Sequence, residues 1–153
     1  MKFLELKVPP VIVFLICLSL IWGANQWVFI EGLSFGAENW IVQIFVAIAV
    51  LIGLLGIIEF RRKSTTVNPH KPGNATTLVT TGIYTFSRNP MYTALLIVLI
   101  AGALKWGSLV GFLVLPLFII YMNRFQIKPE ETVLEEKFGE EFIFYKEDVR
   151  RWA

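Results

Sequence analysis

The apolar residues of this chain fall into four long blocks separated by polar segments. The blocks run from Val8 to about Ile30, from Trp40 to Phe60, from Met91 to Leu104 and from Leu109 to about Ile127. The second block has the ~20 residues that a helix needs to cross the hydrocarbon of a bilayer, and the third, at about 14 residues, is short. The pattern predicts an all-α integral membrane fold with about four transmembrane helices.

Polar segments connect the last two blocks and continue beyond the fourth. The turn signal at 105–108 predicts that the third and fourth blocks form a helical hairpin. From Lys128 onward, apolar residues recur at helical spacing, which predicts amphipathic cytoplasmic helices. Pro129 suits a first helical position, with two acids in the first turn, and Gly139 predicts a break.

The charges between the blocks predict the orientation of the chain in the membrane. Between the first two blocks the only charges are those of Glu31 and Glu38. Positive charges precede the first block and fill the loop at 61–90: Lys2, Lys7, Arg61, Arg62, Lys63, Lys71 and Arg88. Cytoplasmic loops carry such an excess of Lys and Arg. We therefore expect a multi-pass protein of a prokaryotic inner membrane, with both termini and the 61–90 loop in the cytoplasm.

The N-terminus also resembles a secretory signal. Lys2 and Lys7 precede an apolar stretch that reaches Trp22, but no clean small-x-small cleavage site comes after it. We interpret this segment as a retained first membrane helix. No repeat or second domain is visible, so residues 1–153 are expected to form one domain, with two helices in 1–60 and the functional half in 61–153.

Composition narrows the range of functions. Of 153 residues, 56% are hydrophobic and 17% are charged, and the net charge is only +2, which argues against nucleic-acid binding. A single cysteine excludes an intramolecular disulfide and a cysteine-based metal site. A single histidine, His70, excludes a multi-histidine metal site, and we interpret it as a solvated loop residue.

Candidate chemistry lies in the polar segment that enters the third block. Arg88 could simply anchor the helix at the membrane surface, or its guanidinium could grip a ligand carboxylate. Pro90 pre-sets a helix start, where free backbone N–H groups bind anions. Together these features predict a carboxylate cradle. Gly82 and Tyr84 suit either an ordinary turn or a close approach of the backbone to a ligand.

A pair of carboxylates comes directly after the fourth block. Glu130 and Glu131 could be simple helix-start charges, or they could bind ribose hydroxyls or an ammonium group. They leave the fourth block on the side where Arg88 enters the third, so a hairpin would bring the three residues together. Tyr92 and Tyr145 suit interfacial anchors or ligand contacts.

Two motifs in this order carry a family resemblance. The first is Gly82-x-Tyr84-x-x-x-Arg88-Asn89-Pro90-x-Tyr92. The second begins at Pro129-Glu130-Glu131 and continues through Leu134, Phe138, Gly139, Phe142, Tyr145, Val149 and, shifted by one, Arg150. Together they resemble the isoprenylcysteine carboxyl methyltransferase and phospholipid methyltransferase family over residues 65–152. Asn89 stands where the family usually has histidine, and an amide does not titrate near neutral pH.

The resemblance implies an integral membrane methyltransferase that uses S-adenosylmethionine at the cytosolic face, with a lipophilic acceptor that enters from the bilayer. It implies Arg88 and Glu131 as catalytic residues. The cofactor-binding residues that it implies are Leu78, Val79, Gly82, Tyr84, Arg88, Asn89, Pro90, Tyr92, Glu130, Glu131 and Tyr145.

The identity of the acceptor depends on whether a base is present. A carboxylate is already a nucleophile and needs mainly alignment with the methyl donor, whereas a thiol or an amine must lose a proton. No base stands out in the sequence, which favours an isoprenylcysteine-like carboxylate. A small four-helix transporter and a non-catalytic membrane scaffold are the alternatives. Transporters normally carry an ionisable residue inside a span, and the centres of these blocks have none.

Overall fold

The computed structural model describes residues 5–27, 37–63, 75–107 and 109–152, and within them all regular structure is helical. The longer helices are α1 (Pro10–Trp27), α2 (Asn39–Arg62) and α3 (Pro90–Trp106). A 3-10 turn, η3 (Gly82–Thr85), precedes α3. After it come α4 (Leu109–Phe112), α5 (Val114–Met122), the π-helical turn η4 (Asn123–Ile127), α6 (Lys128–Phe138) and α7 (Glu140–Asp148). These helices match the predicted all-α fold class.

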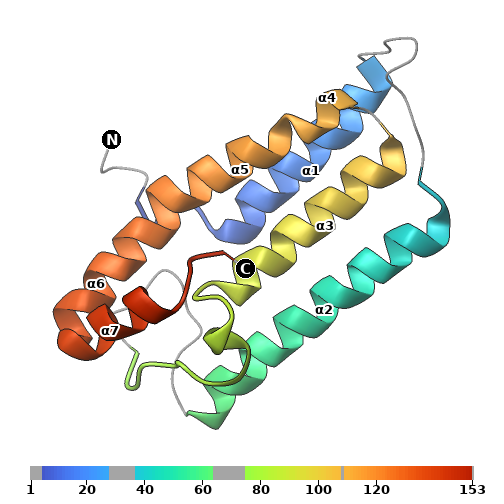
Figure 1. Ribbon diagram of the computed structural model, residues 1–153. Coiled ribbons are helices and arrows are strands. Elements are labelled where there is room, and N and C mark those ends of the chain that lie inside the picture. Colours follow the sequence, from blue (N-terminus) through green and yellow to red (C-terminus); the bar gives the residue numbers. More distant parts are fainter. Residues whose placement is uncertain (1–4, 28–36, 64–74, 108, 153) are drawn as a thin grey trace.

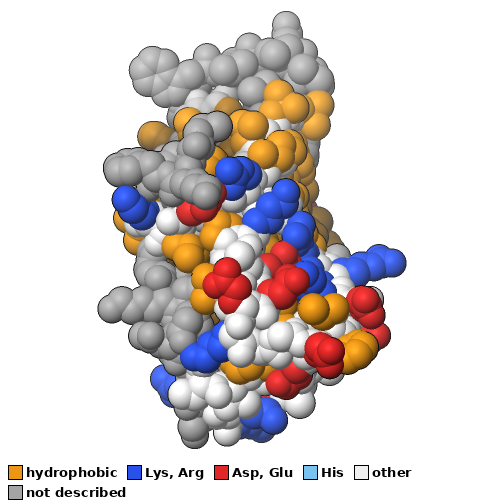
Figure 2. All heavy atoms as spheres, turned by 90° about the vertical axis from the view of Figure 1, so that its left-hand side faces the viewer, with side chains coloured by type: hydrophobic (Ala, Val, Ile, Leu, Met, Phe, Trp, Pro, Cys, Tyr) orange, Lys and Arg blue, Asp and Glu red, His pale blue; other side chains and the backbone are white. Residues whose placement is uncertain are grey.

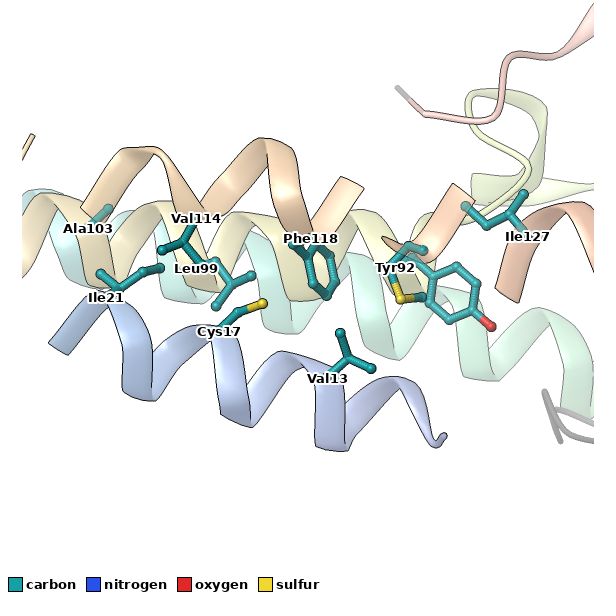
Figure 3. Close-up of a cluster of buried hydrophobic side chains, with 10 residues drawn as sticks. Val13, Cys17, Ile21, Tyr92, Leu99, Ala103, Val114, Phe118 and Ile127 are labelled. Carbon is teal, nitrogen blue, oxygen red and sulfur yellow. The ribbon is translucent and has the colours of Figure 1, made fainter. Parts of the chain in front are cut away.

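Helix α3 lies at the centre of the bundle and packs against α1, α2, α4 and α5 (Figure 1). The main core forms where α1, α3 and α5 meet, around Leu99 and Phe118, which are fully buried. Figure 3 shows Tyr92 at one end of this row of core side chains, with its hydroxyl pointing away from Phe118. The core therefore delivers a polar group to one end of the bundle.

The outer surface of the bundle is strongly apolar. In the most apolar 18-residue stretch of α2, only 11% is buried inside the protein. Leu51 on this helix is 58% exposed. Among the described residues, α2 is the helix that is long and apolar enough to cross a membrane, while α1 and α3 are shorter apolar helices. An exposed apolar helix of this length is expected in contact with lipid. The four crossings remain a prediction.

The end of the third block is further along the chain than predicted. Helix α3 has 17 residues and continues through Lys105 and Trp106, which were assigned to a turn. The turn begins at Gly107, whose φ of 67° is left-handed and whose N–H bonds the carbonyl of Ala103. Glycine adopts this conformation without the steric penalty that a Cβ imposes.

Pro129, Glu130 and Glu131 lie in the first turn of α6 as predicted, but the helical backbone does not begin there. Ile127 and Lys128 keep right-handed helical dihedral angles, so the helical backbone passes from η4 directly into α6. The π-helical turn lies just before the proline, where a regular helix would lose a hydrogen bond. Glu130 and Glu131 therefore owe their environment to side chains around them rather than to a free helix N-terminus. The break at Gly139 is confirmed, because α6 ends at Phe138 and α7 begins at Glu140.

Candidate functional site

The C-terminal end of α2, the N-terminal end of α3, and α6 with α7 gather at one end of the bundle (Figure 1). Figure 2 looks at this end and shows Lys, Arg, Asp and Glu side chains collected over it. A cleft there is partly open to solvent and encloses about 80 Å³. This cleft is the candidate functional site.

Eight of the eleven predicted site residues line the cleft: Leu78, Val79, Tyr84, Arg88, Asn89, Glu130, Glu131 and Tyr145. Six further lining residues were not predicted: Phe60, Ala75, Thr77, Ile127, Leu134 and Phe142. Five of these six residues are apolar or aromatic, so they add apolar surface to the cleft. Gly82, Pro90 and Tyr92 lie outside the lining. His70 lies outside the described residues.

Two tyrosines fix the wall formed by η3 and α7. The hydroxyl of Tyr145 donates to the carbonyl oxygen of Tyr84 at 2.7 Å, and both residues are buried. Leu78 and Phe142 pack beside Tyr145 in a small satellite core. Burial raises the pKa of both phenols well above its usual value, so both remain neutral. Tyr145 therefore lies in the cleft wall and is held there by Tyr84.

Arg88 connects three segments of the chain. One guanidinium nitrogen donates to the carbonyl oxygens of Lys146 and Val149 at 2.8 and 2.6 Å. The other donates to the Glu131 carboxylate at 2.8 Å, which confirms that the hairpin brings these residues together. The Nε atom of Arg88 is buried and has no hydrogen-bond partner among the described residues. Arg88 thus keeps one fully buried donor that has no partner among the described residues.

Glu131 receives a second guanidinium that the sequence did not predict. Arg151 donates to both oxygens of its carboxylate, at 2.8 and 2.6 Å. Burial alone would raise the pKa of Glu131, but the hydrogen bonds and positive charges of Arg151 and Arg88 outweigh it and hold the pKa below its usual value. Glu131 is therefore ionised at neutral pH. Two cations around one anion leave one positive charge in excess at this edge of the cleft.

Glu130 has a different environment although it is the next residue. The buried hydroxyl of Tyr92 donates to its Oε1 atom at 2.5 Å. Burial raises the pKa of Glu130 to about 8; the charge of Glu131 adds to the rise, and the hydrogen bond from Tyr92 opposes it. Glu130 is therefore mostly protonated at neutral pH. Tyr92 does not line the cleft itself, and it is connected to the cleft through the carboxyl of Glu130.

The start of α3 differs from a free anion-binding helix end. Pro90 is the first helical residue and is buried. The amides of Tyr92 and Thr93 donate to the Asn89 carbonyl at 3.0 Å. The Asn89 side chain donates to the carbonyl oxygen of Arg151 at 3.1 Å. Asn89 therefore holds the C-terminal segment and lines the cleft at the same time.

Gly82 has a packing role next to α2. Its φ is 60°, and an added Cβ would lie 2.7 Å from the carboxylate of Glu59. Glu59 is buried and accepts a hydrogen bond from the Thr81 hydroxyl at 2.9 Å. The glycine thus lets the turn approach a carboxylate of the protein itself, and this contact places Tyr84 in the cleft wall.

The most consequential residue that the sequence did not indicate is Arg151. It is separated from Glu131 by 20 residues, and its position near a C-terminus gave no sign of a buried partner. Its local signal is that it comes after the apolar positions of α7 and precedes Trp152, whose indole N–H donates to Asn123 at 3.1 Å. Through this contact of Trp152, the segment after α7 folds back on the protein.

Comparisons with known proteins agree with this layout. The family model of the phospholipid methyltransferases matches residues 37–141, which include α2, α3 and the paired acids of α6. A protein of Haemophilus influenzae, described as uncharacterized, is 48% identical over 62 residues, which are 40% of this chain and 98% of that protein. No solved structure matches the chain.

Proposed function

Since this chain belongs to the phospholipid methyltransferase family, we propose that it transfers a methyl group from S-adenosylmethionine to a lipophilic acceptor at the cytoplasmic face of a membrane. The family is one of membrane-associated methyltransferases that act on lipid-like substrates. The observation that carries the proposal is the cleft at one end of an apolar bundle, which is lined by apolar side chains together with Arg88, Glu130 and Glu131.

The residues of the cleft fit S-adenosylmethionine. An adenine ring requires a flat apolar surface, which Phe60, Leu134 and Phe142 offer. A carboxylate group requires an edge with excess positive charge, which Arg88 and Arg151 provide around Glu131. Hydroxyl and ammonium groups require acceptors, which the Glu131 side of the cleft supplies. When bound, this cofactor would supply an activated methyl group on a positively charged sulfur.

The protein then has to align two reactants and exclude water. Arg88, Asn89 and Arg151 hold the C-terminal segment beside α3 through the hydrogen bonds described above. That segment comes directly after α7, so its attachment keeps Tyr145 and Phe142 in the cleft wall. We therefore assign Arg88 a double role: it closes the site and it places a positive charge at its edge.

We propose that the acceptor reaches the site from the bilayer. The cofactor is polar and comes from the cytosol, whereas the surface of α2 is apolar and exposed almost throughout. Phe60, near the end of α2, lines the cleft, so the apolar outer surface and the polar site meet there. The proposed topology is multi-pass with both termini in the cytoplasm, and an isoprenylcysteine-like carboxylate is one acceptor of the expected lipophilic kind.

The same helices support the function of a transporter less well. Transporters hold ionisable residues within their spans. Of charged residues, the described part of α1 has none, α3 has only Lys105 near its end, and α2 has Glu59, Arg61 and Arg62 at its end. The ionisable groups collect in the cleft instead.

Filling the cleft tests the proposal. We expect Leu134→Trp to lower the affinity for S-adenosylhomocysteine at least ~10-fold, since Leu134 lines the cleft and a larger side chain would occupy the proposed adenine space. Calorimetry on the protein in detergent measures this. Leu117→Trp, at a 60% exposed position on α5, is the matched control and should bind like the wild type. Equal affinities of all three proteins, or no binding by the wild type, would reject the cleft as the cofactor site.

A further inference from the structure

We propose that residues 5–8, the N-terminal strap, position α6 and with it the cleft, by supplying a hydrogen bond that Pro129 denies to the helix. Leu6 is the central positioning residue, and it acts through its backbone N–H. The inference rests on the proposed function for its effect on cofactor binding, whereas the strap itself is a feature of the fold.

Pro129 creates the defect that the strap repairs. In an α-helix each carbonyl accepts from the N–H four residues later, so the donor for the Phe125 carbonyl would be residue 129. Proline has no N–H, and in a regular helix its ring would clash with that carbonyl. The helix widens here, because the Lys128 N–H donates to the carbonyl of Asn123, five residues earlier. The Phe125 carbonyl therefore cannot receive its ordinary helical donor.

The strap supplies a donor from a distant part of the sequence. The Leu6 N–H donates to the Phe125 carbonyl at 3.0 Å. Beside it, the side-chain amide of Gln126, which is fully buried, donates to the carbonyl oxygen of Val8 at 2.6 Å. Two hydrogen bonds of opposite direction thus join the strap to consecutive residues of η4. Figure 1 shows the blue segment that leads into α1 beside the junction of α5 and α6.

The backbone of Leu6 indicates that the strap is held firmly. Its φ of 57° lies in the left-handed region, which residues with a Cβ rarely adopt. Such a conformation costs free energy and persists where the surrounding structure fixes it. Val8 packs against the main core and fixes the other end of the strap. The ion pair between Glu5 and Arg124 adds little, because the Arg124 side chain is 44% exposed.

The π-helical turn connects the strap to the cleft. Ile127, the last residue of η4, lines the cleft, and α6 follows at once with Leu134 in the same lining. Asn123, the first residue of η4, accepts the indole N–H of Trp152, so the C-terminal segment is attached to the same turn. Helices bend at prolines and at π-helical turns. A strap that fixes this turn therefore fixes the direction of α6 and the shape of the cleft.

Leu6→Pro is the variant that releases the strap, because proline has no N–H and cannot adopt a φ of 57°. We expect amide hydrogen exchange in α6 to accelerate roughly 3- to 10-fold, which corresponds to one net hydrogen bond. Affinity for S-adenosylhomocysteine should fall by a similar factor. Exchange measured by NMR and calorimetry in detergent give the two quantities. Glu5→Ala keeps the Leu6 N–H and should change neither.

Pro129→Ala tests the specific cause. It restores an N–H at position 129, so the helix can serve the Phe125 carbonyl itself. On this background Leu6→Pro should change exchange in α6 by less than ~2-fold. In the Pro129→Ala single variant the Leu6 N–H should lose protection, because it now shares its acceptor. If Leu6→Pro left exchange unchanged in the wild-type background, or accelerated it equally in both backgrounds, the inference would be overturned.

Gln126→Leu is the second variant if Leu6→Pro does not fold, since leucine keeps a similar volume and removes the donor to Val8. Its acceleration of exchange in α6 should also be suppressed by Pro129→Ala, and equal acceleration in both backgrounds would again overturn the inference. Failure of the wild type to bind S-adenosylhomocysteine would reject the proposed function, and the exchange data would still decide the role of the strap. In a wild type that binds, faster exchange in α6 with unchanged affinity would overturn the connection between strap and cleft.

Discussion

Arg88→Ala is expected to release the C-terminal segment and, with it, to abolish high-affinity cofactor binding. The side chain of Arg88 is only 11% exposed and supplies hydrogen bonds to Lys146, Val149 and Glu131. Removing one partner of such a buried pair costs about 3–5 kcal/mol. The local opening free energy of residues 140–152 should fall by that amount, measured by amide hydrogen exchange. Affinity for S-adenosylhomocysteine should fall roughly 150-fold or more, because the closed form becomes scarce.

Arg124→Ala is the matched control for this prediction. Arg124 also forms an ion pair, with Glu5 at 2.8 Å, but its side chain is 44% exposed. Exposed pairs contribute about 0–1 kcal/mol, so exchange in α7 and cofactor affinity should be unchanged. If the two variants had the same hydrogen exchange in α7 and the same cofactor affinity, Arg88 would be only a surface charge at the membrane.

Glu131→Ala should lower the local opening free energy by a similar amount. This variant removes the negative partner of the ion pairs, whereas Arg88→Ala removes a positive one. The carboxylate, 12% exposed, lies between Arg88 and Arg151, so its removal leaves two guanidinium groups without an anion. We expect a loss of about 3–5 kcal/mol in the local opening free energy of α7. A Glu135→Ala variant loses only a half-exposed pair with Lys146 and should lose about 0–1 kcal/mol.

Acid should reproduce this loss in the wild type. The pKa of Glu131 is lowered in the folded protein, so its contribution is complete above the ordinary glutamate pKa near 4.3 and is lost as pH falls through the folded value. Hydrogen exchange in α7 should therefore accelerate below about pH 4 in the wild type. The acceleration should be absent from Glu131→Ala, which has already lost the carboxylate. A wild-type exchange profile that is flat down to pH 3 would contradict the assignment of the ion pair.

The sequence allowed the helices and the meeting of the motifs to be predicted, because both depend on local rules. Apolar blocks of helical length mark α1, α2 and α3, and a hairpin between the third and fourth blocks must bring their polar ends together. The hydrogen bond between Arg88 and Glu131 is a consequence of that geometry. Helix ends were predicted less well, since Lys105 and Trp106 are polar or interfacial yet continue α3.

The different states of Glu130 and Glu131 could not be predicted from sequence. Adjacent residues of one type have the same intrinsic chemistry, and they are separated by desolvation and by the approach of partners from distant segments. Tyr92 precedes α6 in the sequence and binds Glu130, whereas Arg151 follows α6 and binds Glu131. The continuous path through η4 also escaped prediction, because a proline suggests a helix start unless a π-helical turn precedes it.

The most direct test of the central claim is transfer of a labelled methyl group. The protein, purified in detergent, is incubated with S-adenosylmethionine labelled in the methyl group and with a total lipid extract, and the organic phase is counted. The account predicts that label enters the organic phase with the wild type and that Glu131→Ala reduces this by at least ~100-fold, while Glu135→Ala does not. Label that remains wholly in the aqueous phase, or equal transfer by all three proteins, would contradict it.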